Sequence, residues 1–145
     1  MTLQVSMELI ATLACAIFAG AAIYISMVEH PARMSCGTEL AATEWGPSYK
    51  RATWIQAPLA LIAFACSFAA WFAGSNVWWL VGGFMLGLLV PYTLIVIMPT
   101  NHRLESSRLD KRSDEALRLL HRWGMLHTVR TIVSFVALII FLLNR

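Results

Sequence analysis

Four long apolar runs, separated by polar segments, dominate the chain. They cover residues 7–28, 52–72, 77–98 and 127–143. Each run is close to the roughly 20 residues with which a helix crosses the hydrocarbon core of a bilayer. Backbone polar groups cannot stay unpaired in lipid, and the strands of a membrane barrel would alternate apolar with polar positions. The pattern therefore predicts an all-α integral membrane four-helix bundle, with residues 1–145 as a single membrane domain.

The charged residues lie almost entirely in two segments, residues 29–51 and 99–122. In a chain with four spans these two segments lie on the same side of the membrane, and the only basic residue on the opposite side is Arg145. The positive-inside rule then predicts cytoplasmic long loops and external termini, in a cell (plasma or inner) membrane. The linker of residues 73–76 contains Gly74, Ser75 and Asn76 and predicts a tight hairpin between spans two and three.

Composition excludes several classes of protein. The chain is 59% hydrophobic and 13% charged, whereas soluble domains average about 25% charged residues. The net charge of +3 does not indicate nucleic-acid binding, because the basic residues flank the membrane, where they set topology and meet anionic lipid headgroups. We expect lipid as a partner, leave a hydrophobic small molecule and a homo-oligomer open, and expect no nucleic acid. The cysteines, Cys15, Cys36 and Cys66, form no CxxC or CxxCH motif.

Small residues recur at every fourth position in three of the runs. Such rows let membrane helices approach closely, and we favour packing inside the bundle over a dimer face. The rows are Ala11, Cys15 and Ala19; Ala65, Ala69 and Ala73; and Gly83 with Gly87.

Two further patterns concern the membrane interfaces. The tryptophans flank the apolar runs, with Trp78 and Trp79 on the outer side and Trp45, Trp54 and Trp123 on the inner side, which predicts aromatic belts. Before the fourth run, Ser113 is a suitable cap for a short cytoplasmic amphipathic helix, which we expect to lie along the membrane surface.

The start of the fourth span carries the polar residues of greatest chemical interest. Trp123, His127 and Arg130 share one helix face at spacing i, i+4, i+7. Arg130 lies about one turn inside the apolar run, where an ionisable group is expensive, faces the bundle interior and needs a partner. Glu29, at the end of span one, is the obvious candidate partner. Snorkelling of Arg130 to the headgroups is the alternative.

The other candidate residues lie at the same predicted mouth. The bundle should bring Asn101, at the end of span three, close to Glu29, His127 and Arg130. Gln56 and Thr93 would extend this polar path, although Gln56 can equally hydrogen-bond a neighbouring helix.

A metal site is a weaker interpretation. All four histidines (His30, His102, His121 and His127) fall on the cytoplasmic side, and histidine with carboxylate can hold iron, copper or zinc. The chain has no HxxxH or HExxH spacing, however, and His121 and His127 do not share a helix face. We therefore predict no cofactor and keep a metal or haem site as an alternative.

Several motifs together resemble a known family. They are Glu29-His30-Pro31-Ala32-Arg33, Trp45-Gly46-Pro47-Ser48-Tyr49-Lys50-Arg51-Ala52, Pro91-Tyr92-Thr93, Met98-Pro99-Thr100-Asn101-His102-Arg103-Leu104 and Trp123-x3-His127-x2-Arg130. They are similar to motifs of a large family of small four-span membrane proteins, mostly uncharacterised, which includes the fungal anthrone oxygenases. The Pro-Thr-Asn and Trp-x3-His-x2-Arg elements are the specific part of the resemblance.

The resemblance implies a chemistry and a set of roles. Anthrone oxygenases are thought to oxidise the activated methylene of a tricyclic phenol with dioxygen, which gives the anthraquinone. The resemblance suggests neither flavin nor nicotinamide, and the chain has no Gly-rich nucleotide motif. It implies His127 as the general base and Arg130 with Asn101 as stabilisers of the anionic oxygen, while Glu29 balances Arg130 or orients His127. The expected substrate-binding residues are Trp123, Gln56, Thr93 and Tyr92.

Two other classes of function remain open on the sequence. A redox protein would hold haem, a metal or a quinone among the helices, with histidines from different spans as ligands. A non-enzymatic assembly or lipid-contacting protein would need the mouth residues for folding alone. If the chain is an enzyme, we expect an oxidoreductase, an oxygenase that works without a cofactor.

Overall fold

The computed structural model describes residues 2–145, which form four long helical rods joined by short connections. The first rod joins α1 (Leu3–Tyr24), the π-helical segment η1 (Ile25–Glu29) and α2 (His30–Ser35). The second rod is α3 (Thr38–Phe72), and the third joins α4 (Trp78–Tyr92), the π-helical segment η2 (Thr93–Ile97) and α5 (Met98–Glu105). The fourth is α6 (Asp114–Leu143). All four rods are long and apolar enough to cross a membrane, which confirms the predicted all-α multi-pass membrane protein.

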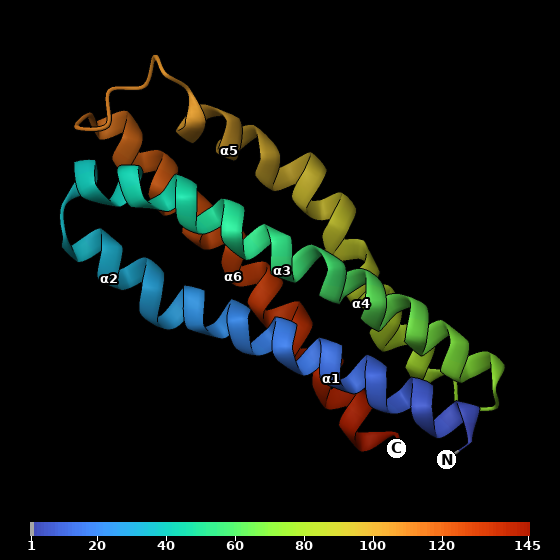
Figure 1. Ribbon diagram of the computed structural model, residues 1–145. Helices are drawn as coiled ribbons and strands as arrows, with labels where there is room; N and C mark the ends of the chain where they lie inside the picture. The colour runs from blue at the N-terminus through green and yellow to red at the C-terminus, as the bar shows by residue number, and fades with distance from the viewer. Residues whose placement is uncertain (1) are drawn as a thin grey trace.

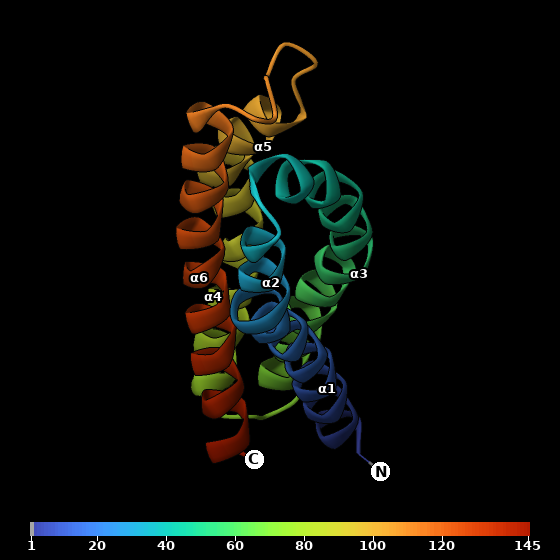
Figure 2. The same ribbon diagram turned by 90° about the vertical axis from the view of Figure 1, so that its left-hand side faces the viewer.

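The rods form an antiparallel bundle in which each packs against two neighbours (Figure 1). Helix α1 packs against α3 and α6, and α4 packs against the same two helices, so the order around the bundle is α1, α3, α4, α6. Both chain termini lie at one end of the bundle, and the α2–α3 and α5–α6 connections lie at the other (Figures 1 and 2). We call the latter the loop end.

Local chemistry explains where the helices begin and end. The Thr2 hydroxyl accepts a hydrogen bond from the Val5 amide at 3.3 Å, and the Ser113 hydroxyl accepts one from the Ala116 amide at 3.2 Å, as N-caps do. Gly74, two residues after the end of α3, adopts φ of +112°, a conformation that glycine takes without strain. The predicted hairpin at residues 73–76 is confirmed.

Close helix approach uses two of the three predicted small-residue rows. Ala11, Cys15 and Ala19 are buried, and Gly87 packs so closely on Phe64 that an added Cβ would lie 2.9 Å from its ring. The row in α3 is wrong, because Ala65 is exposed. The buried row of that helix is instead Ala60, Ala63, Ser67 and Ala70.

The predicted aromatic belts are wrong for three of the five tryptophans, because Trp45, Trp79 and Trp123 are buried inside the bundle. Trp79 stacks on Phe141 with ring centroids 4.8 Å apart, and its indole N–H donates to the Asn144 carbonyl at 3.1 Å. These indoles fill the interior with a large apolar surface and are not interface anchors.

The predicted surface helix before span four also differs from the structure. Ser113 caps a helix as expected, but that helix continues without interruption as α6. The apolar stripe of its first turns is buried against α3 and α5 residues in a second core cluster at the loop end, which includes Trp45, Leu104, Leu119 and Leu120. This stripe packs on protein, so the segment extends the bundle beyond the apolar run.

The contact between α4 and α6 yields a stability prediction. A Cβ on Gly82 would lie 2.6 Å from the ring of Phe141, which is fully buried and stacked on Trp79. Gly82→Ala should therefore destabilise the bundle by about 1–3 kcal/mol, as overpacking does. Gly20→Ala in α1 is the matched control, because no atom lies within 4 Å of the added Cβ. Unfolding in mixed detergent–SDS micelles measures both, and equal stability of the two variants would refute the close contact.

Candidate functional site

Two π-helical segments, η1 and η2, shape the polar region. Each ends two residues before a proline, Pro31 after η1 and Pro99 after η2. Proline lacks an N–H and its ring crowds the carbonyl four residues earlier, so the preceding turn opens. The His30 amide bonds the Ile25 carbonyl and the Met98 amide bonds the Thr93 carbonyl, both at spacing i, i+5. Segments of this kind are frequent at functional sites, and the two prolines were their only signal in the sequence.

His127 of α6 is held by a chain of hydroxyl groups. Its Nδ1 lies 3.0 Å from the Ser26 hydroxyl of η1, which lies 2.8 Å from the Thr131 hydroxyl. Thr131 in turn donates to the Ala22 carbonyl at 3.1 Å. Both hydroxyls can donate or accept, so these contacts suit His127 with Nδ1–H, donating to Ser26, as well as His127 with Nε2–H. The neutral tautomer with Nδ1–H is the one that leaves Nε2 of His127 unprotonated.

Arg130 is buried beside His127 without a carboxylate. Its side chain donates to the Gln56 amide oxygen at 2.8 Å, and its guanidinium carbon lies 5.4 Å from the centre of the Phe18 ring. Arg130 is 8% exposed, its Nε has no hydrogen-bond partner, and among residues 2–145 it forms no ion pair. A charge buried in this way is expensive unless an anion or a polar ligand meets it.

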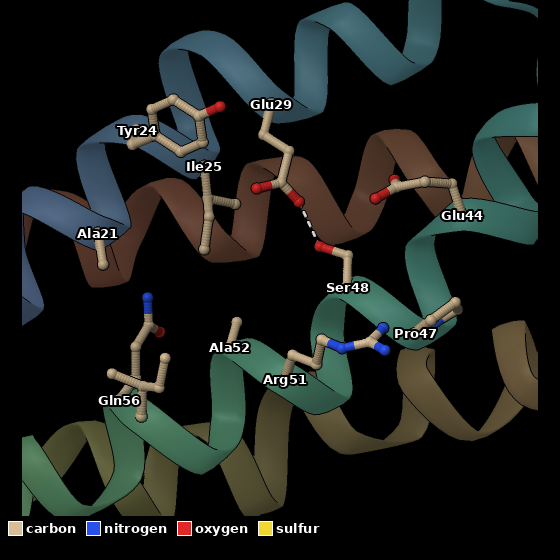
Figure 3. Close-up of a pocket in the computed structure, with 11 residues that line it drawn as sticks. Ala21, Tyr24, Ile25, Glu29, Glu44, Pro47, Ser48, Arg51, Ala52 and Gln56 are labelled. Carbon is tan, nitrogen blue, oxygen red and sulfur yellow. Dashed lines mark hydrogen bonds between the residues drawn. The ribbon is translucent and has the colours of Figure 1, made fainter.

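The predicted pairing of Glu29 with Arg130 is wrong. Glu29 bonds Arg33, one turn along the same rod, and also accepts a hydrogen bond from Ser48 of α3 (Figure 3). Arg33 also contacts Glu44, with Nε 2.8 Å from the carboxylate. A nearer cation of its own helix therefore takes up the carboxylate, and Ser26, not Glu29, orients His127.

One cavity lies between η1 and α3, and we call it the η1–α3 cavity (Figure 3). It measures about 550 Å³. Apolar side chains and Gln56 line one end, whereas Glu29, Glu44, Ser48 and Arg51 line the other. This volume falls within the roughly 300–1,000 Å³ of typical ligand sites.

Two smaller spaces continue this cavity into the bundle. A narrow space of about 10 Å³, the junction, is lined by Trp123, His127 and Arg130 together with Gln56. It shares Ile25, Ser48, Ala52 and Gln56 with the η1–α3 cavity. A third space of about 110 Å³, the α3–α4 cavity, shares Gln56 and Arg130 with the junction and includes Thr93. Gln56 lines all three spaces.

A fourth space lies on the other side of His127. It measures about 260 Å³ and is lined by Ser26, Gly124 and Thr128 with His30, His121 and His127. Among residues 2–145, no three side chains of His, Cys, Asp or Glu are grouped as metal ligands. Cofactor content therefore stays a prediction.

The structure brings together four of the eight predicted site residues: Trp123, His127, Arg130 and Gln56 around the junction. Trp123 stacks on His127 with centroids 4.9 Å apart, so the imidazole covers part of the indole that we expected to meet a ligand. Trp45 packs edge-on against Trp123 at 5.9 Å and was not foreseen in the site.

The other four predicted residues lie apart from the junction. Glu29 lines the far end of the η1–α3 cavity, and Thr93 donates its hydroxyl to the Leu89 carbonyl at 2.7 Å. Tyr92 donates to the Leu126 carbonyl at 3.2 Å. Asn101 is fully buried, its amide nitrogen and oxygen have no partner, and it lines none of these four cavities. Its role in stabilising an oxyanion stays a prediction.

Three residues that the sequence analysis did not name as site residues, Ser26, Ser48 and Arg33, carry hydrogen bonds of the site. Arg33 and Ser48 stood in motifs of the family resemblance without a role, and nothing marked Ser26, because serines are common in membrane helices.

The Arg33 network gives a second stability prediction. The Arg33 side chain is 4% exposed and is the cation for both Glu29 and Glu44. Arg33→Ala leaves both carboxylates without a cation and should lower the free energy of unfolding by about 1–3 kcal/mol, since both retain some solvent contact and Glu29 keeps its hydrogen bond from Ser48. Arg112→Ala, which removes an exposed pair with Glu39, should change little. If the two variants unfold at the same SDS fraction, the Arg33 network does not hold α2 to α3.

Comparison with known proteins assigns the chain to a family. A model of the anthrone oxygenase family matches residues 45–140, a range that includes Gln56, Trp123, His127 and Arg130 but not Glu29. No curated protein and no solved structure matches the chain. The family match covers well over half of the chain and agrees with the four membrane-length helices. This chain belongs to the anthrone oxygenase family.

Proposed function

We propose that this protein oxidises a hydrophobic aromatic molecule of the polyketide type at an activated methylene, with dioxygen as the oxidant. Membership of the anthrone oxygenase family supports the reaction class. His127 and Arg130 at the junction would carry the chemistry, and the η1–α3 cavity would receive the substrate.

The observation that carries the proposal is a buried cation beside a histidine that two hydroxyl groups hold in place. We assign to His127 the neutral tautomer with Nδ1–H, in which Nε2 can take up a proton. Arg130 has no carboxylate to neutralise it and lines the same space as His127. A substrate that loses a proton to His127 becomes an anion within reach of Arg130. Preorganised positive charge in a site without water stabilises such an anion strongly. Stabilisation of this anion would explain why Arg130 is buried without a carboxylate.

The reaction balances without a further reactant. His127 Nε2 takes one proton from the methylene, and the negative charge spreads onto the ring oxygen facing Arg130. The carbanion transfers its electrons to dioxygen, a carbon–oxygen bond forms, and the resulting peroxide anion takes the proton back from His127. Loss of the second methylene proton breaks the O–O bond. The methylene carbon has become a carbonyl, and the second oxygen atom leaves as water.

Substitution of the base tests this assignment. In His127→Gln, oxidation of an anthrone by protein in lipid nanodiscs should fall by about 10²–10⁴-fold, as expected for a lost general base. The control is His102→Gln, since His102 is exposed and lines none of the four cavities. The measurement is the rate of anthraquinone formation above the spontaneous rate. An unchanged rate in His127→Gln would rule out the proposed base, and a Soret band or stoichiometric iron or copper in the parent protein would favour the redox alternative.

Substitution of Arg130 distinguishes a role in the reaction from a role in folding. Arg130→Gln keeps a donor for Gln56 but removes the charge, so oxidation should fall by about 10²-fold or more. Stability in mixed micelles should stay equal or rise, because a buried charge without a counterion has been removed. Loss of stability with an unchanged rate per folded molecule would instead assign Arg130 to folding.

A further inference from the structure

We propose that the η1–α3 cavity is a ligand site open to the lipid, and that Gln56 selects molecules with a carbonyl oxygen at their leading end. The proposal deepens the proposed function. The ligand's role as a substrate rests on that function, whereas the binding of a ligand in this cavity does not depend on it.

The position of the cavity indicates that its ligand comes from the bilayer. Two of its lining residues, Tyr24 and Ile55, are 55% and 59% exposed. Both lie in helices of membrane length, within the apolar runs, so the surface they expose faces lipid. Between them the walls are formed by Ala21, Ile25 and Ala52, which are small or apolar. A flat hydrophobic molecule dissolved in the bilayer can therefore enter between η1 and α3 without crossing water.

The polar side chains that line the cavity differ in whether they already have a hydrogen-bond or ion-pair partner. At the loop end, Glu29 is already bonded to Arg33 and Ser48, and Glu44 contacts Arg33. Among the described residues that line the cavity, Gln56 alone has a buried polar atom without a partner, its amide nitrogen. Figure 3 shows this nitrogen directed from α3 towards α1, across the space between the helices.

The unpartnered amide nitrogen of Gln56 is a hydrogen-bond donor, and the contact of Gln56 with Arg130 strengthens it. Gln56 is 2% exposed, and its amide oxygen accepts a hydrogen bond from Arg130. A cation at the oxygen polarises the amide and makes its N–H groups better donors. A buried donor without a partner is unfavourable, so a ligand that offers an acceptor there gains more than one that does not. Carbonyl oxygens are acceptors only, and this site would place one next to the junction where His127 and Arg130 meet.

The phospholipid acyl chain is the competing occupant, and a matched pair of ligands separates the two. Anthraquinone and anthracene have the same tricyclic shape, but only anthraquinone carries carbonyl oxygens. Benzophenone, an aryl ketone that inserts into nearby C–H bonds under ultraviolet light, is the probe. The protein is irradiated with it in lipid nanodiscs, and the adducts are located by peptide mass spectrometry. This readout needs no turnover.

We expect adducts within residues 21–25 and 52–55, and protection by anthraquinone at a concentration about tenfold lower than by anthracene. Gln56→Leu should abolish that preference. Because this change also removes the partner of Arg130, Ala52→Phe provides a second variant, which fills the cavity and leaves the Gln56–Arg130 contact in place. Ala57→Phe on the same helix lines the α3–α4 cavity instead and should keep the labelling.

Two results would overturn the inference: equal protection by the two competitors, or adducts spread along the lipid-facing residues and insensitive to Ala52→Phe. A different result would contradict the proposed function. Labelling that depends on Gln56 in a protein that oxidises no anthrone would keep the ligand site and reject the oxygenase.

Discussion

The guanidinium of Arg130, held inside the bundle by a neutral amide, is the constraint on which the rest of the site depends. It reaches across from α6 to Gln56 of α3. These two helices lie diagonally in the bundle, and they also meet at the loop end, where Trp45 packs against Trp123. In a protein core surrounded by lipid, a cation without a counterion is hard to maintain unless the surrounding contacts fix it and a ligand makes use of it. The Phe18 ring and Gln56 supply those contacts, and the cavities around Gln56 leave space for the ligand that we propose.

The polar groups at the loop end divide into two systems that do not share a residue. In one, Arg33 ties Glu29, Glu44 and Ser48 together, and each of the three charged groups has a partner of opposite sign. In the other, Ser26 and Thr131 hold His127 next to Arg130, whose charge has no counterion among the described residues. A network of paired charges holds helices in place, whereas an unpaired cation beside a histidine suits a reaction that generates an anion. The η1–α3 cavity runs from the first system to the second.

Both π-helical segments help to create this arrangement. η1 carries Ser26 and Glu29, one residue for each system, and η2 carries Thr93 at the α3–α4 cavity. A wider turn changes which side chains of a rod face inward, and the proline after each segment maintains it. The same rods stay continuous, so the site gains its geometry without a break in a membrane-spanning helix.

The sequence by itself determined the class, the four spans, the hairpin at Gly74 and the grouping of Trp123, His127 and Arg130. These follow from the length of apolar runs, from glycine chemistry and from helical spacing, which are local properties. The family resemblance added the family, which is confirmed, and the reaction class that we propose, and helical spacing could give neither.

Only the tertiary structure decided which residues meet across helices. Glu29 pairs with Arg33, one turn along its own rod, whereas Arg130 meets Gln56 of α3 and no carboxylate. Asn101 carries a family motif yet lies in the core beside Ile97 and Leu104, because the helix face of the third rod is fixed by packing at η2 and α5. Trp45 and Trp79 are buried although their positions suit an interface, since indoles fill space wherever the bundle leaves it. Rotation and packing of whole helices are properties of the assembled bundle, and a pattern of hydrophobic positions does not specify them when lipid and protein interior are equally apolar.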